Sequence, residues 1–264
     1  MMNIIELNRK IFGLTQKSLN VLSSIKWILD YANYKKYVLP NQTMRDSAGN
    51  KRCYILGNGP SLKSVDLSAL QGKEVITVNK SVCTPVFDEI KPRFHVVIDR
   101  FILADVADRI EEELRKDNQD TIFILHRSGI ERFSKYPRAR FVYGTRMASG
   151  KNAIRNDMTC NMTTFLNVLP FATLCATYFG YKEIVLLGND FNFFAARKDQ
   201  HFYDLESNKK RTESLYSDLA GCSIVLIEYK NLYNYAISNG IQIVNATKGS
   251  LLDEIPQVNL ADYI

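Results

Sequence analysis

The chain has 264 residues, of which 46% are hydrophobic and 23% charged, and this ordinary globular composition excludes a disordered protein. The 34 Lys and Arg residues against 28 Asp and Glu give a formal net charge of +6. That charge favours anionic partners such as nucleotide phosphates, acidic glycans or a membrane surface. We expect no nucleic-acid partner, because no basic run alternates with aromatic residues in a recognisable module.

The five cysteines are scattered, odd in number and never in a Cys-x-x-Cys arrangement, which argues against a disulfide framework and against a zinc site. No stretch reaches the ~18 uninterrupted apolar residues of a membrane span, and the N-terminus lacks the order of a signal peptide. These features predict a cytoplasmic protein. A lipid-linked substrate would then be met at the inner face of the inner membrane.

Residues 3–37 place apolar or small residues at alternating steps of three and four, which predicts a helix, with Gly13 as a point of interruption. We assign residues 1–40 to an N-terminal helical segment. It is expected to pack on the core as a helical hairpin, to pair in a homo-oligomer, or to make a peripheral membrane contact. Residues 41–52 are polar and turn-rich and are predicted to link this segment to a catalytic domain at 53–264.

A short apolar run at 53–56 ends abruptly in Gly57-Asn58-Gly59-Pro60-Ser61. Four residues are too few for a helix but suit a buried strand, so the pattern predicts a strand, a tight loop and a helix. Gly59 would let a ligand approach the main chain, and Ser61 would offer a hydroxyl beside open N–H groups, as in a phosphate site. Neither the dinucleotide fingerprint nor the P-loop fits, since a third glycine is missing and Leu62 precedes Lys63-Ser64.

Short β-branched and aromatic runs alternate with helical patterns along the rest of the chain. This predicts βαβ units and an α/β, Rossmann-like fold, in which helices flank a mainly parallel sheet. Strands are expected at 53–56, 74–78, 94–98, 121–125, 183–187 and 241–244, with an edge strand at 141–143, and helices at 102–116, 164–179 and 212–239.

Polar residues follow the ends of the predicted strands, namely Asn58, Asn79, Asp99, His126, Asn189-Asp190 and Asn245. Each one alone is typical of a turn. Because ligands of open α/β sheets bind outside the carboxyl ends of the strands, the whole set predicts a ligand site at that edge.

The loop 189–203 is rich in aromatic residues that could shape a sugar or base pocket. Arg197 and Lys198 could bind phosphate or carboxylate, and they would lower the pKa of His201 if they lie close to it. An imidazole titrates near neutral pH, so His201 is the best candidate for a general base. Of the other histidines, His95 is expected in the core, and His126 is a site residue or part of a turn.

Three motifs carry a resemblance to known proteins: Gly57-Asn58-Gly59-Pro60-Ser61-Leu62, then Asn79, then Gly180-Tyr181-Lys182-Glu183-Ile184 with Gly188-Asn189-Asp190-Phe191. They resemble bacterial sialyltransferases of the Campylobacter lipooligosaccharide type. They are similar also to a wider Rossmann-like superfamily that includes archaeal 6-hydroxymethylpterin diphosphokinases and motility-associated glycosyltransferases. The likeness covers roughly residues 52–255.

The resemblance implies an inverting, metal-independent glycosyltransferase that needs no cofactor. It would transfer sialic acid or a related acid sugar from a CMP-activated donor to a glycan or glycolipid acceptor of lipopolysaccharide or capsule. The donor would be bound by the first loop and the polar strand ends, at Gly57, Asn58, Gly59, Ser61, Asn79, Asp99 and Asn189. The catalytic residues would be His201, Asp190 and Tyr203.

The sequence departs from the sialyltransferase pattern at several positions. Asp99 stands where the family has Asn, and Asn192 stands where a tyrosine follows Asp-Phe, which makes Tyr203 a substitute candidate. His201 follows Asp190 by a spacing closer to that of the diphosphokinase-like relatives. Two alternatives stay open: an ATP-dependent diphosphokinase acting on a small hydroxymethyl compound, with Asp99 and Asp190 as magnesium ligands, and a non-catalytic assembly protein with a nucleotide-binding fold.

Overall fold

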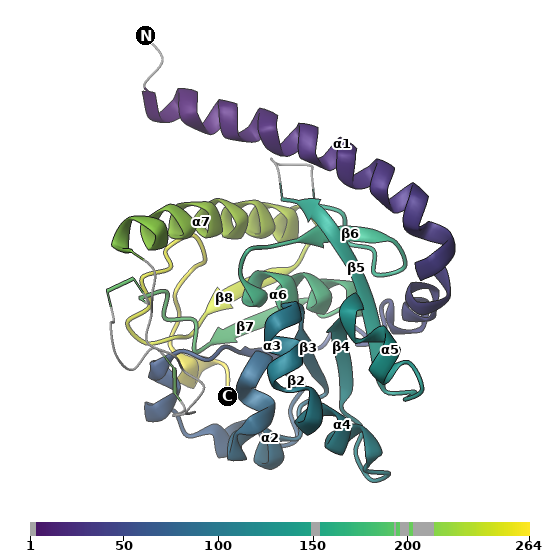
Figure 1. Cartoon of the computed structure of the whole chain (residues 1–264). Helices are drawn as coiled ribbons and strands as arrows, with labels where there is room; N and C mark the ends of the chain where they lie inside the picture. Colours follow the sequence, from purple (N-terminus) through teal and green to yellow (C-terminus); the bar gives the residue numbers. More distant parts are fainter. Residues whose placement is uncertain (1–3, 149–153, 193, 196–200, 203–213) are drawn as a thin grey trace.

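The computed structural model describes residues 4–148, 154–192, 194–195, 201–202 and 214–264. Its eight strands form one sheet in the order β6-β5-β4-β3-β2-β1-β7-β8, and every ladder between them is parallel (Figure 1). The α/β, Rossmann-like fold predicted from the sequence is confirmed, and these ladders make the sheet parallel throughout rather than mainly.

The strands are β1 Arg52–Leu56, β2 Val75–Val78, β3 Phe94–Val97, β4 Ile122–His126, β5 Ala139–Met147, β6 Asn161–Thr164, β7 Glu183–Leu187 and β8 Gln242–Asn245. The run expected as a short edge strand at 141–143 is the nine-residue β5. The edge is formed instead by β6, whose sequence Asn-Met-Thr-Thr is too polar to stand out as a strand.

The helices are α1 Ile4–Val38, α2 Pro85–Ile90, α3 Arg100–Asp105, α4 Ala107–Arg115, α5 Ile130–Phe133, α6 Val168–Phe179 and α7 Leu215–Ser238. The single helix expected at 102–116 is divided into α3 and α4 at Val106. Helix α6 begins where the Asn167 side chain accepts a hydrogen bond from the Leu169 N–H, and it ends at Gly180, which has a φ of 92°.

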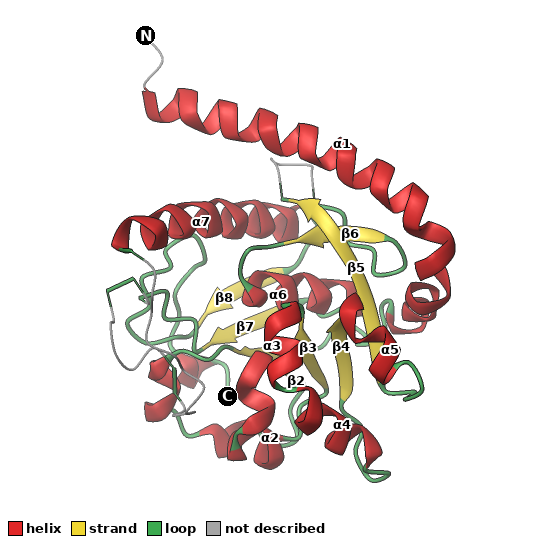
Figure 2. Ribbon diagram, in the orientation of Figure 1, coloured by secondary structure: helices red, strands yellow, loops and turns green. Residues whose placement is uncertain are grey.

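Both faces of the sheet are buried under helices, as expected of parallel strands (Figure 2). In β1, Cys53 and Ile55 pack in the cluster that contains residues of α6 and α7, whereas Tyr54 and Leu56 pack on the opposite face. The alternation shows why β1 reads as an uninterrupted apolar run, because successive side chains enter two different cores.

Helix α1 is continuous through Gly13, so the predicted hairpin is wrong. The helix runs antiparallel to β5: Asn20 binds the main chain of Met147, Trp27 packs on Tyr143 at 4.7 Å between ring centroids, and Tyr37 packs on Phe141. The length of β5, the strand on which the helix packs, was itself underestimated from the sequence. A nine-residue β5 offers a length of surface that a single helix can follow.

The segment predicted as a linker is packed against the sheet domain. Asn41 is fully buried, and its amide donates to the carbonyls of Phe141 and Met158 at 2.8 and 2.9 Å. The Ala48 N–H donates to the Phe179 carbonyl at 2.7 Å. Residues 39–48 therefore tie α1 to β5 and α6, although their polar, turn-rich sequence is typical of a free connection.

Candidate nucleotide site at the sheet switch point

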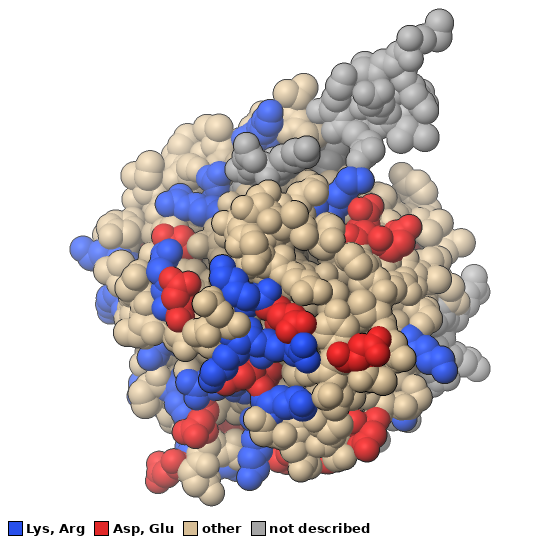
Figure 3. Space-filling view, turned by 180° about the vertical axis from the view of Figure 1, so that it is seen from behind, with Lys and Arg blue, Asp and Glu red and all other residues tan. Residues whose placement is uncertain are grey.

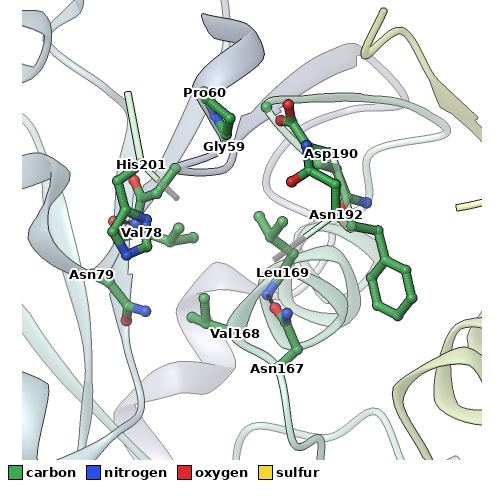
Figure 4. A pocket seen from close by; sticks show the side chains of 14 residues that line it. Gly59, Pro60, Val78, Asn79, Asn167, Val168, Leu169, Asp190, Asn192 and His201 are labelled. Carbon is green, nitrogen blue, oxygen red and sulfur yellow. Dashed lines mark hydrogen bonds between the residues drawn. The ribbon is translucent and has the colours of Figure 1, made fainter. Parts of the chain in front are cut away.

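The chain leaves β1 on one side to build β2 to β6 and then returns to the other side of β1 with β7. Such a switch point is where open α/β sheets bind ligands. A cavity of about 330 Å³ opens there, between the loops after β1, β2 and β7 and the start of α6 (Figure 4). It is lined by Asn58, Gly59, Pro60, Val78, Asn79, Asn167, Val168, Leu169, Gly188, Asn189, Asp190, Phe191, Asn192 and His201.

The glycines of the first loop pack it against the loop after β7. The Gly57 N–H donates to the Leu187 carbonyl at 2.7 Å, and the Gly59 N–H donates to the Gly188 carbonyl at 2.9 Å. Gly59 has an ordinary φ of −67°, but a Cβ there would collide with the Gly188 carbonyl and the Asp190 carboxylate. Gly59 lines the cavity, yet the space beside its Cα is filled by the chain rather than left for a ligand.

Asp190 holds the start of the short 3-10 helix at Pro60–Ser64. Its Oδ1 accepts from the Ser61 N–H at 3.0 Å, and its Oδ2 accepts from the Ser61 hydroxyl at 2.7 Å. A protein carboxylate therefore occupies the position where the sequence predicts a bound phosphate. Ser61 spends both of its donors on Asp190 and does not line the cavity.

We expect Asp190→Ala to lower the free energy of unfolding by about 1–3 kcal/mol, because it leaves the half-buried donors of Ser61 without a charged acceptor. Asp190→Asn should cost less, since its amide oxygen can still accept from the Ser61 N–H and its NH₂ can donate to the hydroxyl. Urea unfolding measures both variants. Equal losses of stability in the two would contradict this loop-fixing role, and a stable but inactive Asp190→Asn would support the predicted catalytic one.

Three asparagines in the cavity each carry a buried amide atom without a hydrogen-bond partner in the described part of the chain. These atoms are Oδ1 of Asn58, Oδ1 of Asn79 and Nδ2 of Asn189. The other amide atom of each of two of these residues is bonded: Nδ2 of Asn58 donates to the Val78 carbonyl at 3.4 Å, and Oδ1 of Asn189 accepts from the Tyr229 hydroxyl at 3.2 Å. An unsatisfied buried polar group costs about 1–3 kcal/mol, so three together in one cavity indicate a polar ligand.

His95 fixes the backbone that presents Asn79. Asn79 has a φ of 53°, a left-handed conformation that asparagine tolerates better than most residues. The His95 Nε2 lies 3.0 Å from the Asn79 carbonyl and the Nδ1 lies 2.8 Å from the Thr77 hydroxyl, so Nε2–H donates and Nδ1 accepts. Burial lowers the pKa of His95 to about 3, which keeps it neutral. The prediction that His95 is a core residue is confirmed.

His201 lines the cavity on the side of Val78 and Asn79 (Figure 4). The neighbouring Phe202 N–H donates to the Asn58 carbonyl at 3.0 Å and so ties this part of the long loop to the first loop. Burial lowers the pKa of His201, a hydrogen bond to the Asn58 main chain raises it, and Lys80 lowers it. The net lowering favours a neutral imidazole at pH 7 that can accept a proton. Tyr203, Arg197 and Lys198 lie outside the described residues.

A second cavity of about 300 Å³ shares Asn79, Asn167 and Val168 with the first, so the two cavities are neighbours. Asp99 lies here rather than in the first cavity, and its Oδ1 accepts from the N–H groups of Phe101 and Ile102 at the start of α3. Of the other predicted donor-binding residues, Asn79 alone lines this second cavity with Asp99, and the Asp99 carboxylate has a helix-capping role.

The wall of the second cavity is held by a buried carboxylate that the sequence gave no reason to single out. Glu228 of α7 accepts from the Leu166 N–H at 3.1 and 2.9 Å, and burial raises its pKa to about 7. Asn167, which lines both cavities, was also missed as a site residue. Its position directly before the apolar helix α6 could have indicated it from the sequence, since asparagine is a favoured N-cap residue.

Two of the polar strand-end residues form turns instead of lining either cavity. The Nδ1 of His126 accepts from the Ser128 N–H at 3.1 Å, and Asn245 binds Thr247 and Ser250. Asn58, Asn79, Asn189 and Asp190 are the strand-end residues that meet in the first cavity. In the described part of the chain, no group of three His, Cys, Asp or Glu side chains could hold a metal ion.

The model of the 6-hydroxymethylpterin diphosphokinase MptE-like family matches residues 26–195, which is 170 of the 264 residues. The chain belongs to this MptE-like family. The matched region of the MptE-like chain begins within α1 and ends in the loop after β7, so it contains β1 to β7 and most of the residues that line the cavity. A search of curated proteins found no match.

Solved structures of the sialyltransferase CstII from Campylobacter jejuni are similar to this MptE-like chain. One, in complex with the substrate analogue cytidine-5′-monophosphate, shares 16% identity at a TM-score of 0.50, covering 79% of this chain and 84% of the other. Another, in complex with a trisaccharide acceptor and CMP, shares 17% identity at a TM-score of 0.46, covering 79% and 86%. At this identity the first match shows a common fold. The family model confirms the predicted relationship to the diphosphokinase-like proteins, and the likeness to the sialyltransferase is confirmed at the level of the fold.

Proposed function

We propose that the chain is a glycosyltransferase that transfers sialic acid or a related acid sugar from a CMP-activated donor to a surface-glycan acceptor. The observation that carries this proposal is the cavity at the switch point, where unpartnered amide atoms of Asn58, Asn79 and Asn189 lie with His201. Amides can both donate and accept, which suits the hydroxyl, amide and ring nitrogen groups of a nucleotide sugar. The fold shared with a sialyltransferase that binds CMP adds support.

In the proposed reaction, the acceptor hydroxyl oxygen bonds to the anomeric carbon of the donor while the bond from that carbon to the phosphate oxygen breaks. CMP leaves with the electron pair, and the acceptor proton passes to the neutral imidazole of His201. The cavity aligns the two reactants, which is the main contribution a protein makes to such a displacement. The second cavity adjoins the first and would receive the acceptor.

In this proposal the nucleotide-sugar donor is bound by side chains rather than by main-chain N–H groups. The N–H groups of Gly59 and Ser61 already bind Gly188 and Asp190. Among the described residues that line the first cavity, the buried side-chain atoms without a hydrogen-bond partner belong to Asn58, Asn79 and Asn189. We therefore expect Asn58→Ala and Asn79→Ala to weaken donor binding, each by about 1–3 kcal/mol if its amide makes a buried hydrogen bond.

The family's own description favours a second candidate, diphosphoryl transfer from ATP to a hydroxymethyl compound. That chemistry normally uses magnesium held by carboxylates. Both oxygens of Asp190 bind Ser61, and the Oδ1 of Asp99 caps α3, so both carboxylates already hold the backbone in place. The engagement of these carboxylates therefore supports the glycosyltransferase better than the magnesium-dependent kinase.

A thermal-shift panel of CMP, UDP, GDP and ATP, each with and without magnesium, separates the candidates. We expect CMP to stabilise the protein without magnesium, by about 2.7 kcal/mol at one hundred times its Kd, and Asn58→Ala to weaken the effect. A shift given by ATP with magnesium and not by CMP would overturn the glycosyltransferase proposal in favour of the kinase. If no nucleotide shifts the melting temperature, the result would favour a non-catalytic assembly protein.

A further inference from the structure

Around residues 16–23, helix α1 packs on the protein with a polar face, whereas Trp27 and Tyr37 farther along pack their rings on β5. Gln16, Asn20 and Ser23 are buried, with 3%, 7% and 8% of their surface exposed. The Asn20 amide donates to the Met147 carbonyl at 3.0 Å and accepts from the Met147 N–H at 2.7 Å, while the Ser23 hydroxyl lies 2.7 Å from that of Thr145. A helix on the surface of a globular protein normally buries its apolar stripe, so this arrangement is inverted.

The opposite face of α1 is apolar and exposed. We call the following residues the outer stripe: Leu14, Val21, Leu22, Ile25, Ile28 and Leu29, which are 63%, 60%, 61%, 50%, 72% and 75% exposed. At about 100° per residue they fall on one side of the helix, directly opposite Gln16, Asn20 and Ser23. A contiguous exposed apolar surface of this kind marks a contact with another molecule or with lipid.

The charge of α1 identifies what covers the outer stripe. The helix contains six Lys or Arg and two Asp or Glu residues, a net charge of +4 out of +6 for the whole chain, and no acidic residue lies between positions 7 and 29. In Figure 3 the charged side chains along the uppermost edge, where α1 runs on from its grey first turns, are basic. A second copy docked with its outer stripe against this one would bring two positively charged helices together, and they would repel each other. An anionic lipid surface instead attracts such a helix.

We propose that α1 binds in the plane of an anionic membrane surface, with the outer stripe in the acyl boundary and the lysines at the headgroups. In the described part of the chain, no helix is long and apolar enough to cross a membrane. An amphipathic helix that lies in the interface needs no such length, only an apolar face and basic flanks.

The path of α1 connects this surface with the candidate site. Asn20 contacts Met147, the last residue of β5, so the turns of the helix before residue 20 project past the carboxyl end of the strand (Figure 1). The cavity opens at the same edge of the sheet. Binding through α1 would thus hold that edge near the membrane, where a glycolipid acceptor would lie. This last step rests on the proposed function, while membrane binding does not.

Sedimentation of the full chain with vesicles tests the proposal. We expect the protein to sediment with phosphatidylcholine vesicles that contain phosphatidylglycerol, and far less with phosphatidylcholine alone. Leu22→Glu with Ile25→Glu should lower the partition coefficient about 100-fold or more. Lys17→Gln with Lys26→Gln should lower it about five-fold per lysine on the anionic vesicles. The matched control is Ile237→Glu, at an equally exposed apolar residue of α7, which should bind as the wild type does.

The fluorescence of Trp27, the single tryptophan, verifies that α1 is still seated in each variant, because its ring packs on Tyr143 on the inner face of the helix. Unchanged emission together with lost vesicle binding supports the proposal. Wild-type protein that fails to sediment with anionic vesicles overturns it. So does a wild-type dimer that Leu22→Glu with Ile25→Glu splits into monomers, since the outer stripe would then bind a second copy. Membrane binding by a protein that binds no nucleotide would refute the proposed function alone.

Discussion

Replacing His201 with alanine is expected to lower kcat by roughly 10²- to 10⁴-fold while donor affinity stays nearly unchanged. The imidazole lies in the cavity, and burial lowers its pKa, so it is a neutral proton acceptor at pH 7. In the proposed reaction it acts on the acceptor hydroxyl, not on the nucleotide. Donor affinity is measured by titration with CMP, and kcat with a soluble acceptor.

The pH dependence follows from the same lowered pKa. A base must be deprotonated to act, so kcat should stay constant as the pH falls from 8 and decline only below about 6.5, the ordinary pKa of a histidine. The matched control is His126→Ala, because His126 lies in a turn outside both cavities. If His201→Ala keeps near-normal turnover, or loses donor binding in proportion to activity, His201 is not the base.

Gly59→Ala is expected to destabilise the fold by about 3 kcal/mol, a large share of the 5–15 kcal/mol typical of a protein. The new Cβ would meet the Gly188 carbonyl and the Asp190 carboxylate, so the loops after β1 and β7 would have to separate. The hydrogen bonds from Gly59 to Gly188 and from Ser61 to Asp190 would be strained or lost with them. Chemical denaturation followed by circular dichroism measures the change.

Gly221→Ala provides the control for this substitution. Gly221 lies in α7, where an added Cβ meets nothing within 4 Å, so alanine should leave stability unchanged or raise it by up to about 1 kcal/mol. The sequence alone predicts that Gly59 leaves room for a ligand beside the main chain. A Gly59→Ala protein with wild-type stability and no nucleotide binding would restore that expectation.

Local pattern determined the fold class of this chain. After a charged first residue, β1 and β7 are short apolar runs followed by glycine, and their type and position were predictable because a strand buried on both faces needs apolar side chains on both. The long helices at both ends of the chain carry many turns of periodic sequence. By contrast β6 is four polar or thioether residues, and only its ladder to β5 makes it a strand.

The strand-end rule predicted the edge of the sheet where the candidate site lies, but the partners of each side chain were decided by the tertiary structure. Asn58, Asn79 and Asn189 meet because β2, β1 and β7 are neighbours in the sheet, an order that no local pattern states. Asp190 and Ser61 are 129 positions apart, so nothing in either stretch indicates that a carboxylate fills the predicted phosphate position. The inward polar face of α1 is the clearest case. Its periodicity predicts an amphipathic helix, but which face turns inward depends on β5, whose main chain offers Asn20 hydrogen-bond partners.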